Sequence, residues 1–135
     1  MNFEEQIKSN CGSLPYDRIK VSQFSQLELA TITQGVLFVF ATWSSEAIIS
    51  FRLLCEMLSR SPGARFPLFV INADGFDFDA FQRTLGELPQ GKGEAFWIKS
   101  GQVLFRDRGY TDATKGVLKA RIESLNLPEP NGSDV

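Results

Sequence analysis

Cysteine supplies the most reactive side chains of this 135-residue sequence, at Cys11 and Cys55, and the chain contains no histidine. Without histidine, the Ser-His-Asp and Cys-His arrangements of hydrolytic enzymes are excluded, together with the commonest general base and the commonest metal ligand. Two cysteines alone are too few for a structural zinc site, which takes four ligands. We therefore expect no catalytic residue, no metal and no cofactor.

The two cysteines lie in different predicted settings. Cys55 falls within an apolar helical segment beside Leu54 and Met57, so we expect it to pack as a small hydrophobic side chain. Cys11 comes near the end of a first helix, where we expect it to be open to solvent. Because the N-terminus carries no export signal, free thiols are expected rather than a disulfide.

Ser44 and Ser45 are the remaining candidate nucleophiles. Either hydroxyl would need a lysine or carboxylate base, and no such pairing is evident in the sequence. Both serines come where a helix is expected to begin, and Glu46 suits the positive end of that helix. We therefore predict a helix cap here and no catalytic serine.

Acidic and aromatic residues alternate over residues 74–79. Asp74-Gly75 is typical of a turn, and an aspartate that follows it can cap the next helix. Phe76 and Phe78 either pack inward or form an exposed docking patch. We expect at least one of these two rings to belong to the core.

The composition is that of one soluble domain, with 43% hydrophobic residues, 22% charged residues and a net charge of −2. No block of Lys and Arg suggests a nucleic acid or a membrane surface as partner, and the apolar run 35–41 is too short to span a bilayer. We expect a single domain over residues 1–126 and a flexible tail over 127–135. We also expect the protein to be cytoplasmic and to be a monomer or weak homodimer.

Hydrophobic periodicity, together with turn and capping signals, predicts alternating helices and strands. The run 36–41 is apolar throughout, as in a strand that is covered on both faces. Helices are expected at 2–10, from Ser22 or Ser25 to Gly35, and at 45–60, 77–85 and 111–125; strands are expected at 18–21, 36–41, 66–71, 95–98 and 103–106. This order predicts an α/β fold in which right-handed crossovers and a closing hairpin build a mixed central sheet with helices on both faces.

Trp43 directly before a helix, and the octet Phe96 to Val103, resemble the thioredoxin-like superfamily. The octet is similar to that family's penultimate strand, Lys-Asn-Gly-Glu turn and final strand, and Gly109 to the glycine that precedes its last helix. The resemblance covers about residues 18–125. It implies a three-layer α/β/α sandwich with a central mixed sheet, to which this chain adds an N-terminal helix.

Four positions that carry the family's redox chemistry are changed in this chain. The nucleophilic cysteine corresponds to Ser44, the resolving cysteine to Ala47, the buried acid to Phe38, and the cis-proline to a position near Gly93. A helix N-terminus stabilises a thiolate, but a serine hydroxyl is too weak an acid to benefit. The resemblance therefore implies a scaffold without thiol–disulfide exchange.

The resemblance also implies a groove beside Trp43 that receives an extended segment of a partner protein. The expected partner-binding residues are Trp43, Ser44, Ser45, Glu46, Lys92, Gly93, Glu94, Phe76 and Phe78. A redox-inactive module that binds through this groove or a sheet edge would be an adaptor, an assembly chaperone or an immunity protein that neutralises a toxin. Two alternatives stay open: Trp43 covers only the strand end, or the chain is a permanent structural subunit.

The alternative of a different class is an enzyme of the same superfamily. Such an enzyme would use the thiol of Cys55 or Cys11, or would bind glutathione without a protein thiol. A lowered cysteine pKa and measurable thiol reactivity would distinguish it from a binding module. The sequence itself contains no recognisable small-molecule site.

Overall fold

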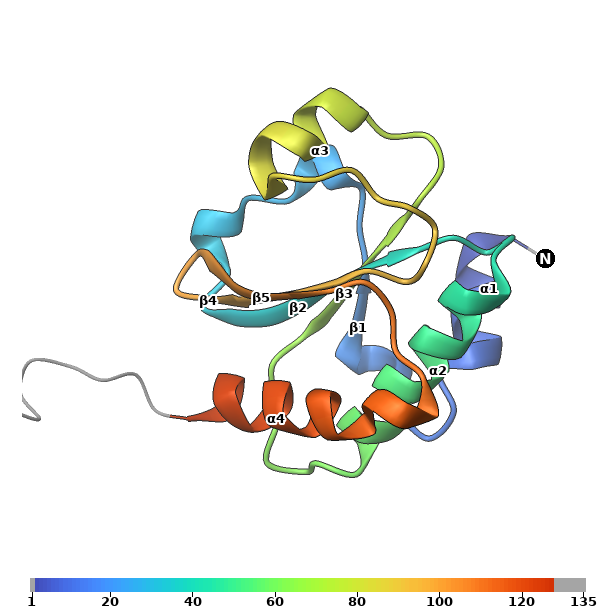
Figure 1. Cartoon of the computed structure of the whole chain (residues 1–135), viewed down its shortest axis with the longest axis vertical. Coiled ribbons are helices and arrows are strands. Elements are labelled where there is room, and N and C mark those ends of the chain that lie inside the picture. Colours follow the sequence, from blue (N-terminus) through green and yellow to red (C-terminus); the bar gives the residue numbers. More distant parts are fainter. Residues whose placement is uncertain (1, 128–135) are drawn as a thin grey trace, which may run out of the picture.

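The computed structural model describes residues 2–127 and contains a five-stranded sheet between helices (Figure 1). The strands are β1 (Ile19–Val21), β2 (Gln34–Phe40), β3 (Leu68–Asn72), β4 (Ala95–Lys99) and β5 (Gln102–Asp107). The helices are α1 (Phe3–Asn10), α2 (Ser45–Ser59), α3 (Phe78–Leu85) and α4 (Lys115–Asn126). The tail expected at 127–135 falls, from residue 128 onward, outside the described residues.

The sheet has the strand order β1-β3-β2-β4-β5. β1, β3 and β2 are parallel to one another, whereas β4 runs antiparallel to both β2 and β5. The expected mixed sheet is thus confirmed. It forms because the two crossovers after β1 and β2 return the chain in the same direction. The connection through α3 then places β4 antiparallel to β2, and the turn at Ser100-Gly101 reverses the chain again into β5.

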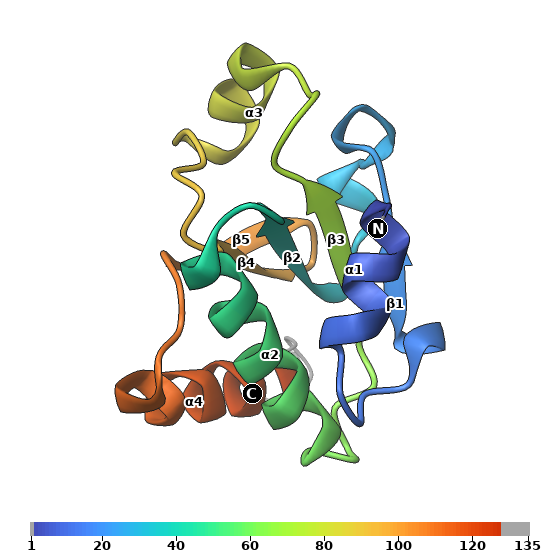
Figure 2. The same ribbon diagram turned by 90° about the vertical axis from the view of Figure 1, so that its right-hand side faces the viewer.

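Helices cover both faces of the sheet, as Figures 1 and 2 show. On one face lie α2 and α4, with α1 packed beside α2. On the other face lie α3 and the segment that connects β1 to β2. The three-layer arrangement with an additional N-terminal helix is therefore as expected. Within residues 2–127, no helix combines the length and apolar character that a bilayer crossing requires.

β2 is the strand around which both cores form. Its side chains alternate between the faces, so Phe38 and Phe40 enter the core under α2, while Leu37 and Val39 enter the core under α3. The rings of Phe38 and Phe40 each lie about 5 Å from that of Phe51 of α2, at 5.2 and 4.8 Å between centroids. An apolar run without alternation is what a strand buried on both faces requires.

The expected N-caps form hydrogen bonds to backbone amides one turn into their helices. Asn2 Oδ1 accepts from the Glu5 amide at 2.8 Å, and Asp77 Oδ1 accepts from the Ala80 amide at 3.1 Å. Each bond satisfies an amide that has no partner within its own helix. These local signals fix the starts of α1 and α3.

The prediction of a helix between Ser22 and Gly35 is wrong. Two separate 3₁₀ turns, Phe24–Gln26 and Leu29–Thr31, connect β1 to β2 instead. Leu27 and Leu29 are both half-buried against the core under α3 although they are two residues apart. An α-helix would direct side chains at that spacing to opposite sides, so burial of both favours an irregular path.

Replacing Phe51 tests the packing of α2 on β2. We expect Phe51→Ala to lower the free energy of unfolding by about 3–5 kcal/mol, because it removes the ring that contacts Phe38 and Phe40 and leaves a cavity. Ile49→Ala, on the exposed side of the same helix, should cost less than about 1 kcal/mol. Urea denaturation of both variants measures the difference, and equal losses would contradict this packing.

Candidate functional site

The site that the sequence singles out lies where β2 ends and α2 begins. Ala41 is fully buried at the end of β2, whereas the Trp43 side chain is 67% exposed. Trp43 Nε1 donates to Asp74 Oδ1 in the loop before α3, at 3.4 Å. The indole ring also lies against Gly91, where a Cβ atom would come within 2.6 Å of Cη2 of Trp43. Two loops distant in sequence therefore hold an exposed aromatic side chain in place.

Ser44 and Ala47, the two positions to which the resemblance assigns cysteines, lie at the start of α2. Ser44 is half-buried, and its Oγ accepts from the amide of Ala47 at 3.2 Å. Ala47 is fully buried. The predicted cap is thus confirmed. The hydroxyl oxygen accepts the hydrogen bond of an amide that could otherwise stabilise an anion at the helix N-terminus.

Phe38, at the position of the family's buried acid, lies in a cluster of aromatic rings. Its ring is 5.8 Å from that of Phe40 and 5.2 Å from that of Phe51, and Phe40 in turn meets Phe3 of α1 at 6.1 Å. These rings provide no group that accepts or donates a proton. Apolar packing therefore occupies the place beneath the first turn of α2 where the resemblance implies a proton relay.

Ser50 of α2 connects the site to two other loops. Its Oγ donates to the carbonyl of Gly93 at 3.0 Å and accepts from the amide of Tyr110 at 3.0 Å, and all of these atoms are buried. Gly93 has a φ of +79°, and a Cβ on it would lie 2.6 Å from Cβ of Ser50. Glycine is required here for both reasons.

Gly93 and Glu94 are not exposed to a partner, contrary to the expectation that they belong to the partner-binding surface. Both are buried, and the carboxylate of Glu94 accepts hydrogen bonds from the amides of Gln90 and Lys92. The Glu94 carbonyl also accepts from the Val39 amide of β2 at 3.0 Å. The Glu94 carboxylate thus holds the 86–94 loop in a compact conformation by accepting from two of its own amides. Glu94 therefore has a structural role.

Residues from three segments line a small cavity beside the first turns of α2. A cavity of about 170 Å³ is lined by Glu46, Ile49, Lys92, Arg108, Gly109, Tyr110 and Thr111. Ile49 is 51% exposed, although its place in the apolar pattern of α2 would assign it to the core. Arg108 gave no signal in the sequence, because only the fold brings the end of β5 beside α2. We define the Trp43 face as Trp43, Ser45, Glu46, Ile49, Lys92 and Arg108.

A buried hydrogen-bonded chain fixes the loop that carries Arg108 and Gly109. Trp97 Nε1 donates to Tyr110 Oη at 2.8 Å, and Tyr110 Oη donates to Asp107 Oδ2 at 2.6 Å. Arg121 of α4 donates twice to the Asp107 carboxylate, at 3.1 and 3.0 Å. Burial is the main cause that raises the pKa of the Tyr110 phenol well above its ordinary value, and the hydrogen bond to Asp107 raises it further. This group therefore stays protonated.

Phe76 and Phe78 occupy different environments. Phe76 is half-buried against Phe24 and Phe81, at 5.9 and 5.2 Å between ring centroids. Phe78 is 50% exposed and meets the Phe76 ring edge-on at 5.1 Å. Phe76 therefore packs against the core under α3 but is only partly buried, and Phe78 lies outside that core.

Both cysteines are free and buried, with 6% of Cys11 and 1% of Cys55 exposed. The expectation that Cys11 is open to solvent is wrong, because the chain after α1 folds back and places Leu14 in the same core. Burial, reinforced by the neighbouring Cys11, raises the pKa of the Cys55 thiol well above its usual range. The described residues contain no group of three or more Cys, Asp or Glu side chains placed to hold a metal ion.

Solved structures share this architecture at low sequence identity. A point mutant of thioredoxin from Halobacterium salinarum is 19% identical with a TM-score of 0.62, over 88% of this chain and 100% of that one. Malassezia sympodialis thioredoxin is 18% identical with a TM-score of 0.62, over 81% and 91%. The chain has a thioredoxin-like fold.

Mitochondrial thioredoxin 3 from Saccharomyces cerevisiae is another structure with this fold, 15% identical with a TM-score of 0.60 over 82% of this chain and 98% of that one. No model of a known protein family matches the sequence, and no curated protein is detectably similar to it. The similarity therefore concerns the thioredoxin-like fold alone, and the function must be argued from the site.

Placing a thiol at the start of α2 tests whether the scaffold still favours a thiolate there. We expect the thiol introduced by Ser44→Cys to have a pKa about 1–2 units below the ordinary value of about 8.5, because the amide of Ala47 and the helix dipole stabilise the anion. Ser61→Cys, just beyond the other end of the same helix, is the matched control.

The rate of alkylation by iodoacetamide against pH, followed by peptide mass spectrometry, gives both pKa values. Mass spectrometry separates the introduced thiol from the buried Cys11 and Cys55. Equal pKa values at the two positions would show that the first turn of α2 no longer provides an anion-stabilising environment.

Proposed function

We propose that this chain is a redox-inactive protein-binding module that holds a partner protein on the Trp43 face. The observation that carries the proposal is the state of Trp43, which is exposed over two thirds of its surface yet held by Asp74 and Gly91. A large aromatic side chain fixed in place loses little conformational entropy on binding. Such side chains dominate the binding energy of many protein interfaces.

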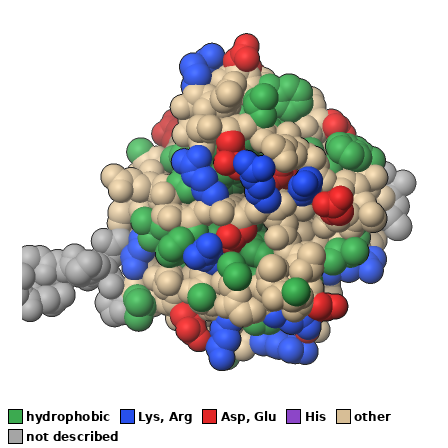
Figure 3. All heavy atoms as spheres, in the orientation of Figure 1, with side chains coloured by type: hydrophobic (Ala, Val, Ile, Leu, Met, Phe, Trp, Pro, Cys, Tyr) green, Lys and Arg blue, Asp and Glu red, His purple; other side chains and the backbone are tan. Residues whose placement is uncertain are grey.

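The rest of the Trp43 face has the composition of an interface rim. Ile49 adds exposed apolar surface, while Glu46, Lys92 and Arg108 place charges of both signs around it. On the face of the molecule seen in Figure 3, basic side chains gather across the middle with acidic ones beside them. Mixed charges favour a protein partner of complementary pattern over a uniformly charged polymer.

The replaced redox positions support a binding role over catalysis. Ser44 is a helix cap, Ala47 and Phe38 are packed in the core, and Gly93 is bonded to Ser50. The two cysteines are buried, and the raised pKa of Cys55 disfavours the thiolate that a thiol enzyme needs. The thiol alternative therefore receives no support from the site.

An adaptor, an assembly chaperone and an immunity protein are the kinds of module that fit this proposal. These three kinds of module would bind different partner proteins, but each would use the Trp43 face. We place the protein in the cytoplasm, as a monomer or weak homodimer in the absence of its partner.

The proposal is tested by recovery of partners from an extract of the source cells, with wild type and Trp43→Ala as paired baits. Leu104→Ala is the matched control, because Leu104 is an exposed apolar side chain on β5 outside the Trp43 face. We expect one protein to be recovered in stoichiometric amount by wild type and Leu104→Ala. Its affinity for Trp43→Ala should be lower by about tenfold or more.

Titration calorimetry with the identified protein then measures the affinities, and equal melting temperatures of the baits show that the fold is retained. An unchanged affinity of Trp43→Ala would exclude the Trp43 face as the binding surface. Equal losses for Trp43→Ala and Leu104→Ala would exclude it as well.

A further inference from the structure

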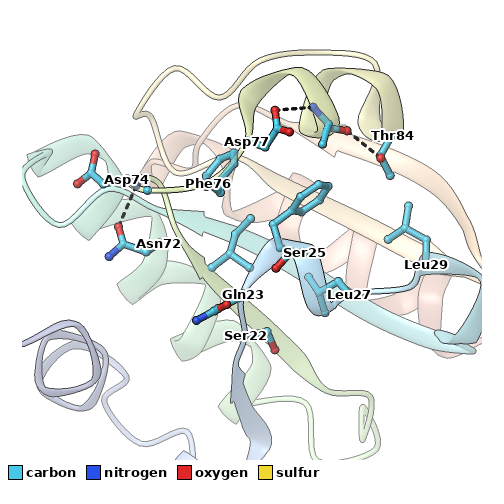
Figure 4. A pocket seen from close by; sticks show the side chains of 14 residues that line it. Ser22, Gln23, Ser25, Leu27, Leu29, Asn72, Asp74, Phe76, Asp77 and Thr84 are labelled. Carbon is cyan, nitrogen blue, oxygen red and sulfur yellow. Dashed lines mark hydrogen bonds between the residues drawn. The ribbon is translucent and has the colours of Figure 1, made fainter.

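A second, larger cavity shares no lining residue with the small cavity beside α2. It has a volume of about 740 Å³ and lies between the β1–β2 connection on one side and the β3–α3 loop with α3 on the other (Figure 4). Its apolar wall is made of Phe24, Leu27, Leu29, Ile71, Phe76 and Ala80. Pockets that bind small molecules have volumes of about 300–1,000 Å³ and walls of this kind.

The cavity exists because the β1–β2 connection is not a continuous helix. The single turns Phe24–Gln26 and Leu29–Thr31 each bring one or two side chains to this side of the sheet. Phe24 is buried against Phe81 at 5.0 Å between ring centroids and forms part of the floor, while Leu27 and Leu29 stay half-buried at the opening. The wall is therefore apolar and in part open to solvent.

The rim of the cavity is polar and carries negative charge only. Its hydroxyl and amide groups come from Ser22, Gln23, Ser25, Asn72 and Thr84, and its carboxylates from Asp74 and Asp77. None of the lining residues in the described part of the chain is Lys or Arg.

The two carboxylates of the rim are hydrogen-bonded without being neutralised. Asp74 accepts from Trp43 Nε1, and Asp77 accepts from the Ala80 amide, as Figure 4 shows for the latter. The salt bridges found among residues 2–127 involve other carboxylates. Two carboxylates without a cationic partner therefore stand beside an aromatic wall.

We propose that this cavity binds a small molecule in which an apolar group is joined to a positively charged nitrogen. The apolar group would pack against Phe24, Phe76 and Ile71, and the nitrogen would pair with one of the two rim carboxylates, Asp74 or Asp77. A cation beside an aromatic face gains further attraction from the ring. The volume exceeds that of any single side chain, which favours a whole small molecule over one anchor residue of a partner. The site shares Asp74 with the hydrogen bond that holds Trp43, but binding of a small molecule here requires no partner protein at the Trp43 face.

Three probes of similar shape test the charge preference. They are phenethylamine, which is a cation, 2-phenylethanol, which is neutral, and 3-phenylpropionate, which is an anion. In ¹H–¹⁵N NMR titrations of the whole chain, we expect phenethylamine to shift resonances from residues 22–29 and 72–84. Its dissociation constant should be at least fivefold lower than that of 3-phenylpropionate, with 2-phenylethanol between them.

Charge-removing substitutions with conserved shape identify the carboxylates responsible. Asp74→Asn with Asp77→Asn should abolish the preference for the cation, and asparagine can still cap α3. Asp79→Asn, on the same helix but outside the cavity, is the matched control and should leave the preference unchanged.

Three results would overturn the proposal. They are shifts of equal size from the cation and the anion, no shift of cavity resonances with any probe, and an equal effect of Asp79→Asn. A peptide such as N-acetyl-Lys-Phe-Lys-amide that binds where phenethylamine does not would also overturn it, in favour of a protein segment as occupant.

Discussion

The hydroxyl group of Ser50 holds together the three segments that shape the end of β2. It donates to Gly93 in the loop before β4 and accepts from Tyr110 in the loop before α4, while Ser50 itself belongs to α2. Because a buried carbonyl or amide without a partner costs about 1–3 kcal/mol, the folded chain keeps these segments in contact. Ser50 thereby joins the loop of Lys92, which the Glu94 carboxylate folds, to the loop of Arg108, which the bonds of Tyr110 and Asp107 hold.

Positions to which the resemblance assigns redox chemistry serve packing and helix capping in this chain. Phe38 adds a ring to an aromatic cluster where an acid would need solvation, and Ser44 caps α2 by accepting from the amide of Ala47. Burying an ionisable group without partners is costly, so replacing it by a ring removes a cost that catalysis would otherwise justify. The surface that remains around Trp43 is held by well-packed and hydrogen-bonded segments.

Local signals in the sequence predicted the elements whose causes are local. The apolar run of β2 and the caps Asn2, Ser44 and Asp77 depend on neighbours within four residues, and the structure contains each of them. The connection between β1 and β2 was predicted wrongly, because burial of Leu27 and Leu29 depends on the sheet beneath them. For the same reason, the exposure of Ile49 and the contact of Trp43 with Gly91 had no signal in the sequence.

The central claim is that a thioredoxin-like scaffold is retained here without thiol–disulfide exchange. The most direct test is the rate at which the purified chain accelerates reduction of insulin disulfides by dithiothreitol, for wild type and for Cys11→Ser with Cys55→Ser. We expect both proteins to leave the uncatalysed rate unchanged, since both native thiols are buried and positions 44 and 47 carry no sulfur. A clear acceleration by wild type that the double substitution removes would contradict the account and identify a thiol enzyme.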